Sequence, residues 1–183
     1  MMGWLKHLIA AGLVLYPTIL YFLHDSVPAY VFVATVLALI GLRLTFSNAA
    51  GGVWRYPLLF VLFGLVGLTL LDLELATRAY PALMAFGFAV LFGYTLLEPP
   101  TLIERLSRLR DPELPPEGVV YCRSVTIVWA LFCLVNGVVA TATALLGSWE
   151  LWSLWTGVIS YVGMGILFVG EMMLRKRLRR ARG

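Results

Sequence analysis

The chain has 183 residues, of which 61% are hydrophobic and only 13% are charged. An ordinary soluble domain has about 25% charged residues, and a soluble fold this small has too much surface for its volume to bury so many apolar side chains, so a soluble domain is excluded. The net charge is +4, but six of the fourteen basic residues lie in the last nine positions beside an apolar run. That position is typical of contact with anionic lipid headgroups rather than nucleic acid.

Six apolar runs follow one another along the chain, each close to the roughly 20 residues that cross a hydrocarbon core of about 30 Å. They cover residues 5–23, 28–44, 56–71, 80–97, 125–146 and 151–174. We therefore predict an all-α polytopic bundle with about six spans, forming a single membrane domain over residues 1–183. The third run is the shortest, so we expect it to tilt little or to thin the bilayer locally.

The first run has a second interpretation, as a secretory signal that is cleaved near Val27-Pro28-Ala29. Five further spans follow it, and Pro28 is a poor neighbour for a cleavage site. We expect the first run to be an uncleaved span.

The basic residues are unevenly divided between the two sides that six spans define. Thirteen of the fourteen fall on the side of the two termini, and Arg78 alone falls on the other side. Lysine and arginine in short loops stay in the cytoplasm. The pattern predicts a bacterial inner-membrane protein with both termini in the cytoplasm.

The stretch between the fourth and fifth spans, residues 98–124, is predicted to be a cytoplasmic loop with a short helix of its own. Thr101 and Glu104 have the spacing of a capping box, and the prolines at 112, 115 and 116 end the pattern. Apolar and basic residues follow at helical spacing on opposite faces, which favours an amphipathic helix at the membrane surface over a plain solvated linker. The apolar face comprises Leu102, Ile103, Leu106 and Leu109, and the basic face Arg105, Arg108 and Arg110.

Basic residues of this loop and of the tail, residues 175–183, predict a surface for anionic lipid headgroups. Its members are Arg105, Arg108, Arg110, Arg175, Lys176, Arg177, Arg179 and Arg180. The sequence has no cluster of histidine, cysteine and carboxylate with metal spacing, no phosphate-binding loop and no nucleophile elbow. We predict no metal, no cofactor and no catalytic residue.

The fifth span carries the best-organised polar residues. Six small or polar residues recur three and four positions apart and so lie on one face of a helix; this polar seam consists of Thr126, Trp129, Cys133, Asn136, Ala140 and Thr143. We favour helix packing, with Asn136 hydrogen-bonded to a neighbouring helix, at roughly 0.6 kcal/mol for each such bond. The alternative is a groove for a lipid or polyene-like ligand, with Trp129 as a stacking surface.

Two charged residues lie near the cytoplasmic ends of the last two predicted spans, with Glu171 inside the last apolar run. Glu171 precedes Arg175 by four residues, the favourable order for an ion pair near the interface, and the alternative is a proton-relay or catalytic carboxylate. Arg123 opens the fifth span, where an arginine is more often a snorkelling anchor than a ligand for phosphate or carboxylate.

Three stretches together resemble the intracellular septation protein A (YciB/IspZ) family. They are Arg78-Ala-Tyr-Pro-Ala-Leu-Met-Ala-Phe86, Leu-Glu-Pro-Pro-Thr-Leu-Ile-Glu-Arg105, and Trp129 with Phe132 and Asn136. The run from Leu114 to Thr126 is similar to a second, uncharacterised group of membrane proteins encoded beside polyene or fatty-acid-type synthesis genes. The resemblance implies an inner-membrane protein with a role in the cell envelope, or beside a membrane-associated synthesis complex.

Our leading hypothesis from the sequence is a non-enzymatic envelope protein whose partners are membrane lipids and other membrane or envelope-synthesis proteins. The rival is a lipid- or polyene-handling transporter or membrane enzyme with a ligand groove along the fifth span. The rival requires a cavity in which several polar side chains of the spans converge.

Overall fold

A computed structural model describes residues 22–23, 26–45, 55–109 and 111–180, with the backbone alone for Arg43, Thr45, Arg55 and residues 176–180. These parts of the chain are all-α, as predicted. Apart from residues 22–23, the first predicted span lies outside the described residues, as do Arg110 and Arg182.

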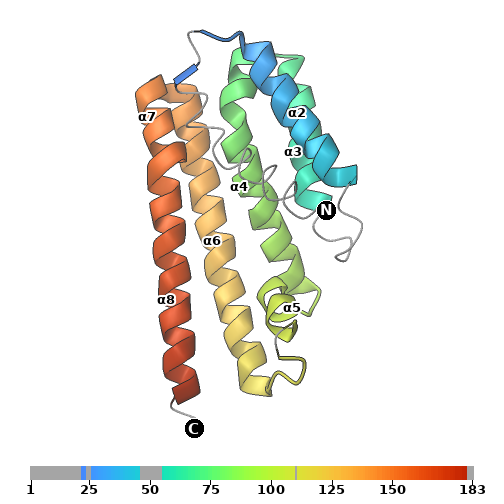
Figure 1. The fold of residues 1–183 in the computed structure, drawn as a ribbon, viewed down its shortest axis with the longest axis vertical. Helices are drawn as coiled ribbons and strands as arrows, with labels where there is room; N and C mark the ends of the chain where they lie inside the picture. Colours follow the sequence, from blue (N-terminus) through green and yellow to red (C-terminus); the bar gives the residue numbers. More distant parts are fainter. Residues whose placement is uncertain (1–21, 24–25, 46–54, 110, 181–183) are drawn as a thin grey trace, which may run out of the picture.

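The described helices follow one another with short connections (Figure 1). Their bounds are α2 Ala29–Thr45, α3 Arg55–Thr69, α4 Leu73–Leu97, α5 Leu102–Arg108, α6 Pro116–Leu146, α7 Trp149–Leu154, the π-helical segment η2 Trp155–Ile159, and α8 Ser160–Arg180. Three continuous helical stretches are long and apolar enough to cross a membrane, namely Leu73–Leu97, Pro116–Leu146 and Trp149–Arg175. Two shorter apolar helices accompany them, α2 and α3. The protein is therefore a multi-pass membrane protein.

Two spans begin earlier than their apolar runs predicted. Helix α4 begins at Leu73 because Asp72 caps it, its carboxylate accepting from the Leu75 amide at 3.0 Å. Helix α6 begins at Pro116 instead of residue 125, since proline is well tolerated in the first turn, where its missing N–H has no intrahelical partner. At about 1.5 Å per residue, the 31 residues of α6 extend about 46 Å, so α6 is longer than the hydrocarbon core is thick.

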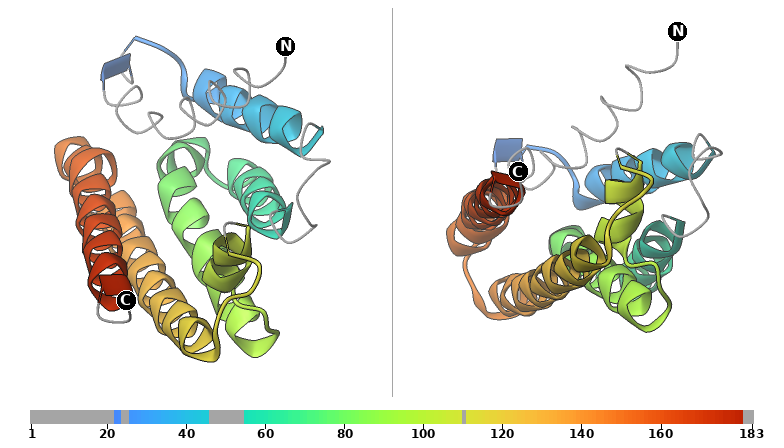
Figure 2. Two further views of the ribbon diagram at one scale, coloured as in Figure 1. Left: turned by 60° about the horizontal axis from the view of Figure 1, so that its bottom comes forward. Right: turned by 90° about the horizontal axis from the view of Figure 1, so that it is seen from below.

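Helix α4 lies at the centre of the bundle. It runs antiparallel to α6 on one side and to α3 on the other, with α2 near α3 and α8 beside α6 (Figures 1 and 2). A core of fully buried side chains joins α2, α3 and α7 at the end of the bundle away from α5, including Val36, Ile40, Val61, Leu65 and Trp152. This core accounts for how the two shorter helices attach to the long ones.

The close approach of α4 and α6 depends on Gly137. A Cβ atom built at this position lies 2.8 Å from the Phe86 ring, well inside van der Waals contact. Small residues permit such close backbone approach between helices in lipid, where packing is the main force that joins them.

Replacing Gly137 with valine should lower the free energy of unfolding by about 2 kcal/mol, because the added methyl groups overpack the contact with Phe86. Unfolding by SDS in mixed micelles measures this. Gly165→Val is the matched control, since nothing lies within 4 Å of a Cβ at Gly165. Equal losses from the two variants would show that valine in the helix, and not the α4–α6 contact, is responsible.

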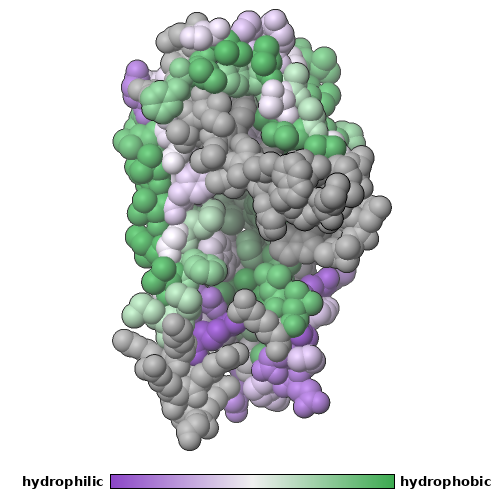
Figure 3. Space-filling model, in the orientation of Figure 1, coloured by the Kyte–Doolittle hydropathy of each residue, from purple (hydrophilic) through white to green (hydrophobic). Residues whose placement is uncertain are grey.

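The polar side chains gather at the ends of the bundle. Figure 3 shows hydrophobic residues along its flank and hydrophilic residues at the lower end, where α5 lies. We call this the basic end, because Arg105, Arg108, Arg123 and Arg175 lie there, whereas Arg78 bonds to the C-terminus of α6 at the opposite end.

Helix α5 forms where the capping box predicted it, but it uses a different face. Thr101 Oγ1 accepts the Glu104 amide at 3.4 Å, while the Glu104 carboxylate binds Arg108 at 2.8 Å. Leu102 is buried against α4 and α6, whereas Leu106 and Leu109 are exposed. The residues of the predicted apolar face are therefore divided between the interior of the bundle and its surface. The reason is that the Leu102 amide donates to Thr95 Oγ1 at 3.1 Å and holds the start of α5 against α4.

Candidate functional site

Asn136 connects α6 to the π-helical segment η2. Its Oδ1 accepts two hydrogen bonds, from Trp155 Nε1–H at 3.1 Å and from Ser160 Oγ–H at 2.6 Å. Residues five apart lie on different faces of an α-helix, but the π-helical turn bonds the Ser160 amide to the Trp155 carbonyl and brings both side chains to one side. The irregular turn is therefore what lets both donors reach the same oxygen.

The orientation of the Asn136 amide follows from chemistry. Trp155 Nε1 is a donor only, so the atom facing it must be the carbonyl oxygen. Among the described residues, Nδ2 of Asn136 has no hydrogen-bond partner and is not enclosed by other atoms. The free N–H donors of this side chain consequently point to accessible space.

Asn136 lines a cavity of about 170 Å³ between α4, α6, η2 and α8, which we call the central cavity. Among the described side chains that line it, none is charged; the polar lining includes Tyr80 of α4, Cys133 and Asn136 of α6, and Thr156 and Ser160 of the π-helical region.

Two helix irregularities flank the central cavity. Pro81 interrupts the regular hydrogen bonding of α4 on one side, and η2 does so on the other. In transport proteins, binding sites lie near the bilayer midplane between interrupted helices of this kind. Asn136 is at the middle of the predicted 125–146 span.

The rest of the polar seam is distributed along the interior of the bundle. Thr126, Cys133, Ala140 and Thr143 are buried, and Thr126 is fully enclosed and donates to the Cys122 carbonyl at 2.7 Å. The seam is used within the chain, against α4 and the π-helical region. Of its six members, Cys133 and Asn136 line the central cavity.

Trp129 lies away from the central cavity. Its ring stacks on Phe92, with centroids 6.3 Å apart and planes 18° apart, and meets the edge of Phe132 at 6.0 Å. These residues belong to the same hydrophobic cluster as Leu102, the residue that begins α5, so Trp129 contributes to the packing of α5.

A second polar cluster joins α5, α6 and α8 at the basic end. Glu171 and Arg175 form the ion pair expected from their spacing, at 3.2 Å, and Arg175 also donates to Ser107 Oγ at 2.8 Å. Cys122 Sγ–H donates to the same oxygen at 3.5 Å, and Tyr121 OH donates to the Glu171 carbonyl at 3.3 Å. This cluster holds α5 and α8 onto α6, a structural role for Glu171 and Arg175.

The predicted anionic-lipid surface is only partly available. Arg108 binds Glu104 and Arg175 binds Glu171, so these two charges are balanced within the chain. Arg105 donates to the Pro100 carbonyl through Nε, and its two terminal nitrogens have no partner among the described residues. The backbone of residues 176–180 continues α8, and the side chains of Lys176, Arg177, Arg179 and Arg180 lie outside the description, as does Arg110.

Two arginines bind the ends of the antiparallel pair α4 and α6 reciprocally. Arg123, near the start of α6, donates to the Leu96 carbonyl at the end of α4 at 3.1 Å. Arg78, near the start of α4, donates to the Thr143 and Gly147 carbonyls at the end of α6, at 2.9 and 2.7 Å. A cation there satisfies carbonyls that have no intrahelical partner and complements the helix dipole.

The importance of Arg78 was missed by sequence reasoning, which counted it only as a charge on the minority side. Its guanidinium also lies 4.9 Å from the centre of the Trp149 ring, and its carbonyl accepts from Trp152 Nε1–H at 3.0 Å. In the sequence, the feature that pointed to this role was that Arg78 is the one basic residue predicted on the side of the membrane that also carries the tryptophan-rich turn after the fifth span.

Fold and site together define an all-α, multi-pass membrane protein with an uncharged polar cavity inside its bundle. No protein-family model, no curated protein and no solved structure matches the chain. The resemblance to the septation protein A family therefore stays a prediction. Within the described part of the chain, no group of three or more histidine, cysteine or carboxylate side chains is placed to hold a metal ion.

Proposed function

We propose that this membrane protein binds a neutral, mostly apolar molecule that carries an oxygen acceptor, with part of that molecule in the central cavity. The observation that carries the proposal is the unpartnered Nδ2 of Asn136 on the wall of a cavity whose described lining bears no charge. A polar donor in the middle of a span is costly to leave without a partner in lipid, and such residues commonly mark a ligand pathway.

The size of the central cavity limits what it holds. Sites that enclose a whole small molecule measure about 300–1,000 Å³, whereas this cavity has about 170 Å³. It accommodates a ring or a short stretch of chain, with the remainder of the molecule outside. Met164, which is 39% exposed, lies both on its wall and at the surface of α8, so a chain has access from the lipid.

We further propose six spans in a bacterial inner membrane, with both termini in the cytoplasm. Support comes from the charges, since four described arginines share the basic end and Arg78 lies at the opposite end. Residues 28–44 and 56–71 would supply two of the spans through α2 and α3, with local thinning of the bilayer around these shorter helices.

A second candidate function is that of a membrane scaffold for envelope-synthesis proteins. The polar seam is occupied within the chain, so a partner helix would use an outer face. Helix α8 favours this reading, because only 6% of the most apolar stretch of Trp149–Arg175 is buried. Recovery of a defined membrane complex after crosslinking from α8 would support it, and exclusive crosslinks to lipid would count against it.

Ligand binding is tested with a long-chain fatty acid methyl ester bearing a diazirine, compared with the matching hydrocarbon probe. We expect the ester to label peptides around Tyr80, Asn136 and Ser160, and Met164→Trp to lower this labelling at least about fivefold by filling the cavity mouth. Ile166→Trp is the matched control, since Ile166 is exposed on the same helix and is not part of the lining. Equal labelling by both probes, or no effect of Met164→Trp, would refute the proposal.

A further inference from the structure

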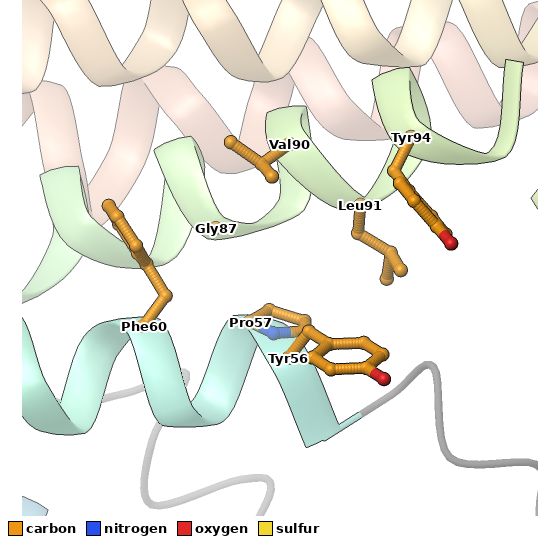
Figure 4. A pocket seen from close by; sticks show the side chains of 7 residues that line it. All are labelled: Tyr56, Pro57, Phe60, Gly87, Val90, Leu91 and Tyr94. Carbon is orange, nitrogen blue, oxygen red and sulfur yellow. The ribbon is translucent and has the colours of Figure 1, made fainter. Parts of the chain in front are cut away.

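A second site lies on the opposite side of α4, in a groove between α3 and α4 with a volume of about 390 Å³. Its residues do not overlap with those of the central cavity. Figure 4 shows Tyr56 and Pro57 of α3 facing Leu91 and Tyr94 of α4 across it. We call it the α3–α4 groove.

The packing of the two helices explains where the α3–α4 groove forms. A Cβ at Gly87 would lie 3.2 Å from Pro57 Cβ and 3.3 Å from the Pro57 backbone, so the backbones of α3 and α4 approach closely there. The buried side chains of Pro57 and Leu91 form the floor. Phe60 and Val90 form walls that are 44% and 62% exposed, so the groove is open towards the lipid.

The mouth of the groove is polar and lies at the basic end. Tyr56 and Tyr94 both line the groove, and Arg105 lies just beyond the end of α4, where its Nε donates to the Pro100 carbonyl at 2.8 Å. The Tyr56 hydroxyl has no hydrogen-bond partner among the described residues, and Tyr94 OH donates to Glu98 Oε2 at 2.6 Å. Tyrosines at this level are typical of the membrane–water interface, where the acyl chains of lipids meet their headgroups.

Arg105 provides the charge. Its terminal nitrogens have no partner in the described part of the chain, whereas Arg108 and Arg175 on the same end are in ion pairs. A planar guanidinium fork binds a phosphate through two parallel hydrogen bonds. The Glu98 carboxylate accepts the hydrogen bond from Tyr94 OH. Its negative charge disfavours a phosphate beside Glu98, so we expect the phosphate of a ligand at Arg105.

From this arrangement, we propose that the α3–α4 groove binds one anionic phospholipid, with an acyl chain along Pro57, Phe60, Val90 and Leu91 and the phosphate at Arg105. An apolar groove open to lipid with a positive charge at headgroup level is complementary to that molecule at both ends. A zwitterionic phospholipid with the same chains has the phosphate but a compensating cation, which Arg105 disfavours. The site is independent of the proposed function of the central cavity.

Native mass spectrometry of the purified full chain, with phosphatidylglycerol or phosphatidylcholine of identical acyl chains, tests the proposal. We expect one retained phosphatidylglycerol per chain, in preference to phosphatidylcholine by about fivefold or more, and a roughly tenfold loss of that retention in Arg105→Gln. Arg108→Gln removes the same charge from the same helix and should retain the lipid, because Arg108 is paired with Glu104.

A second pair of variants addresses the acyl chain and leaves the charges unchanged. Val90→Trp should fill the groove and reduce retention about fivefold, whereas Leu131→Trp, at a similarly exposed position on α6, should not. Equal retention of the two lipids, equal losses from Arg105→Gln and Arg108→Gln, or an unaffected Val90→Trp would overturn the proposal. Since labelling of the central cavity is a separate readout, either site can fail without the other.

Discussion

Replacing Arg78 with methionine should lower the free energy of unfolding by about 3 kcal/mol, because it removes two charge-assisted hydrogen bonds and a contact with the Trp149 ring. Methionine retains the apolar bulk of the side chain, so the loss reflects the guanidinium. The Thr143 and Gly147 carbonyls at the end of α6 would be left without this donor in a region partly shielded from water. SDS unfolding of the purified protein in mixed micelles measures the change.

Lysine at position 78 is the first control. It retains the positive charge near the C-terminus of α6 but lacks the planar fork, so we expect roughly half the loss seen with methionine. Arg123→Met is the second control, at the other end of the same helix pair. Arg123 is exposed and donates one hydrogen bond to the Leu96 carbonyl, so its loss should cost about 1 kcal/mol or less. If Arg78→Met and Arg123→Met were equally mild, Arg78 would not hold α4 to α6.

Replacing Asn136 with leucine should abolish most labelling by the methyl ester probe, with at least about a tenfold loss, while the bundle stays folded. Leucine has nearly the shape of asparagine but lacks both the Oδ1 acceptor and the Nδ2 donor. Hydrogen bonds between helices in lipid average roughly 0.6 kcal/mol each. Losing the bonds from Trp155 and Ser160 should therefore cost only about 1 kcal/mol of stability.

Ser160→Ala separates the two roles of Asn136. It removes one bond to Oδ1 but leaves Trp155 to orient the amide and leaves Nδ2 directed at the central cavity. We expect this variant to be labelled within about twofold of the wild type. Normal labelling of Asn136→Leu would refute the role of the amide as a ligand donor, and labelling lost equally in Ser160→Ala would assign the effect to altered packing.

Polar contacts stabilise the bundle at its two ends. At one end, Arg78, Trp149 and the buried Trp152 join the turn after α6 to α4. At the basic end, Arg175 and Ser107 join α8 to α5. The central cavity is lined by residues of α4, α6, η2 and α8 that belong to neither set of polar bonds.

Helix positions were largely predictable from apolar runs, and their boundaries were not. The runs at 28–44 and 56–71 agree with α2 and α3 to within two residues. The runs at 80–97 and 125–146 were too short, because hydropathy marks where lipid begins and not where a helix begins. Asp72 caps α4 from outside the apolar run. Pro116, in the first turn of α6, also lies outside the apolar run of that helix.

The polar seam was predictable as a face of one helix, since spacing alone places its members. What those members contact was not predictable. Trp129 and Asn136 share the seam, yet Trp129 packs on Phe92 and Asn136 binds the π-helical region. Helical spacing determines which face of a helix the seam residues share. The residues that they contact depend on which neighbouring helix packs against each position along that face.

By itself, the sequence determined that the chain is all-α with helices long and apolar enough to cross a membrane, and that basic residues gather towards one end. Those properties follow from the solvation of individual side chains and from local periodicity. Only the tertiary structure decided that Arg78 binds the end of α6, and that Asn136 faces a cavity between Pro81 and the π-helical turn. These contacts join residues tens of positions apart, so they depend on how the helices pair, which no single stretch of sequence encodes.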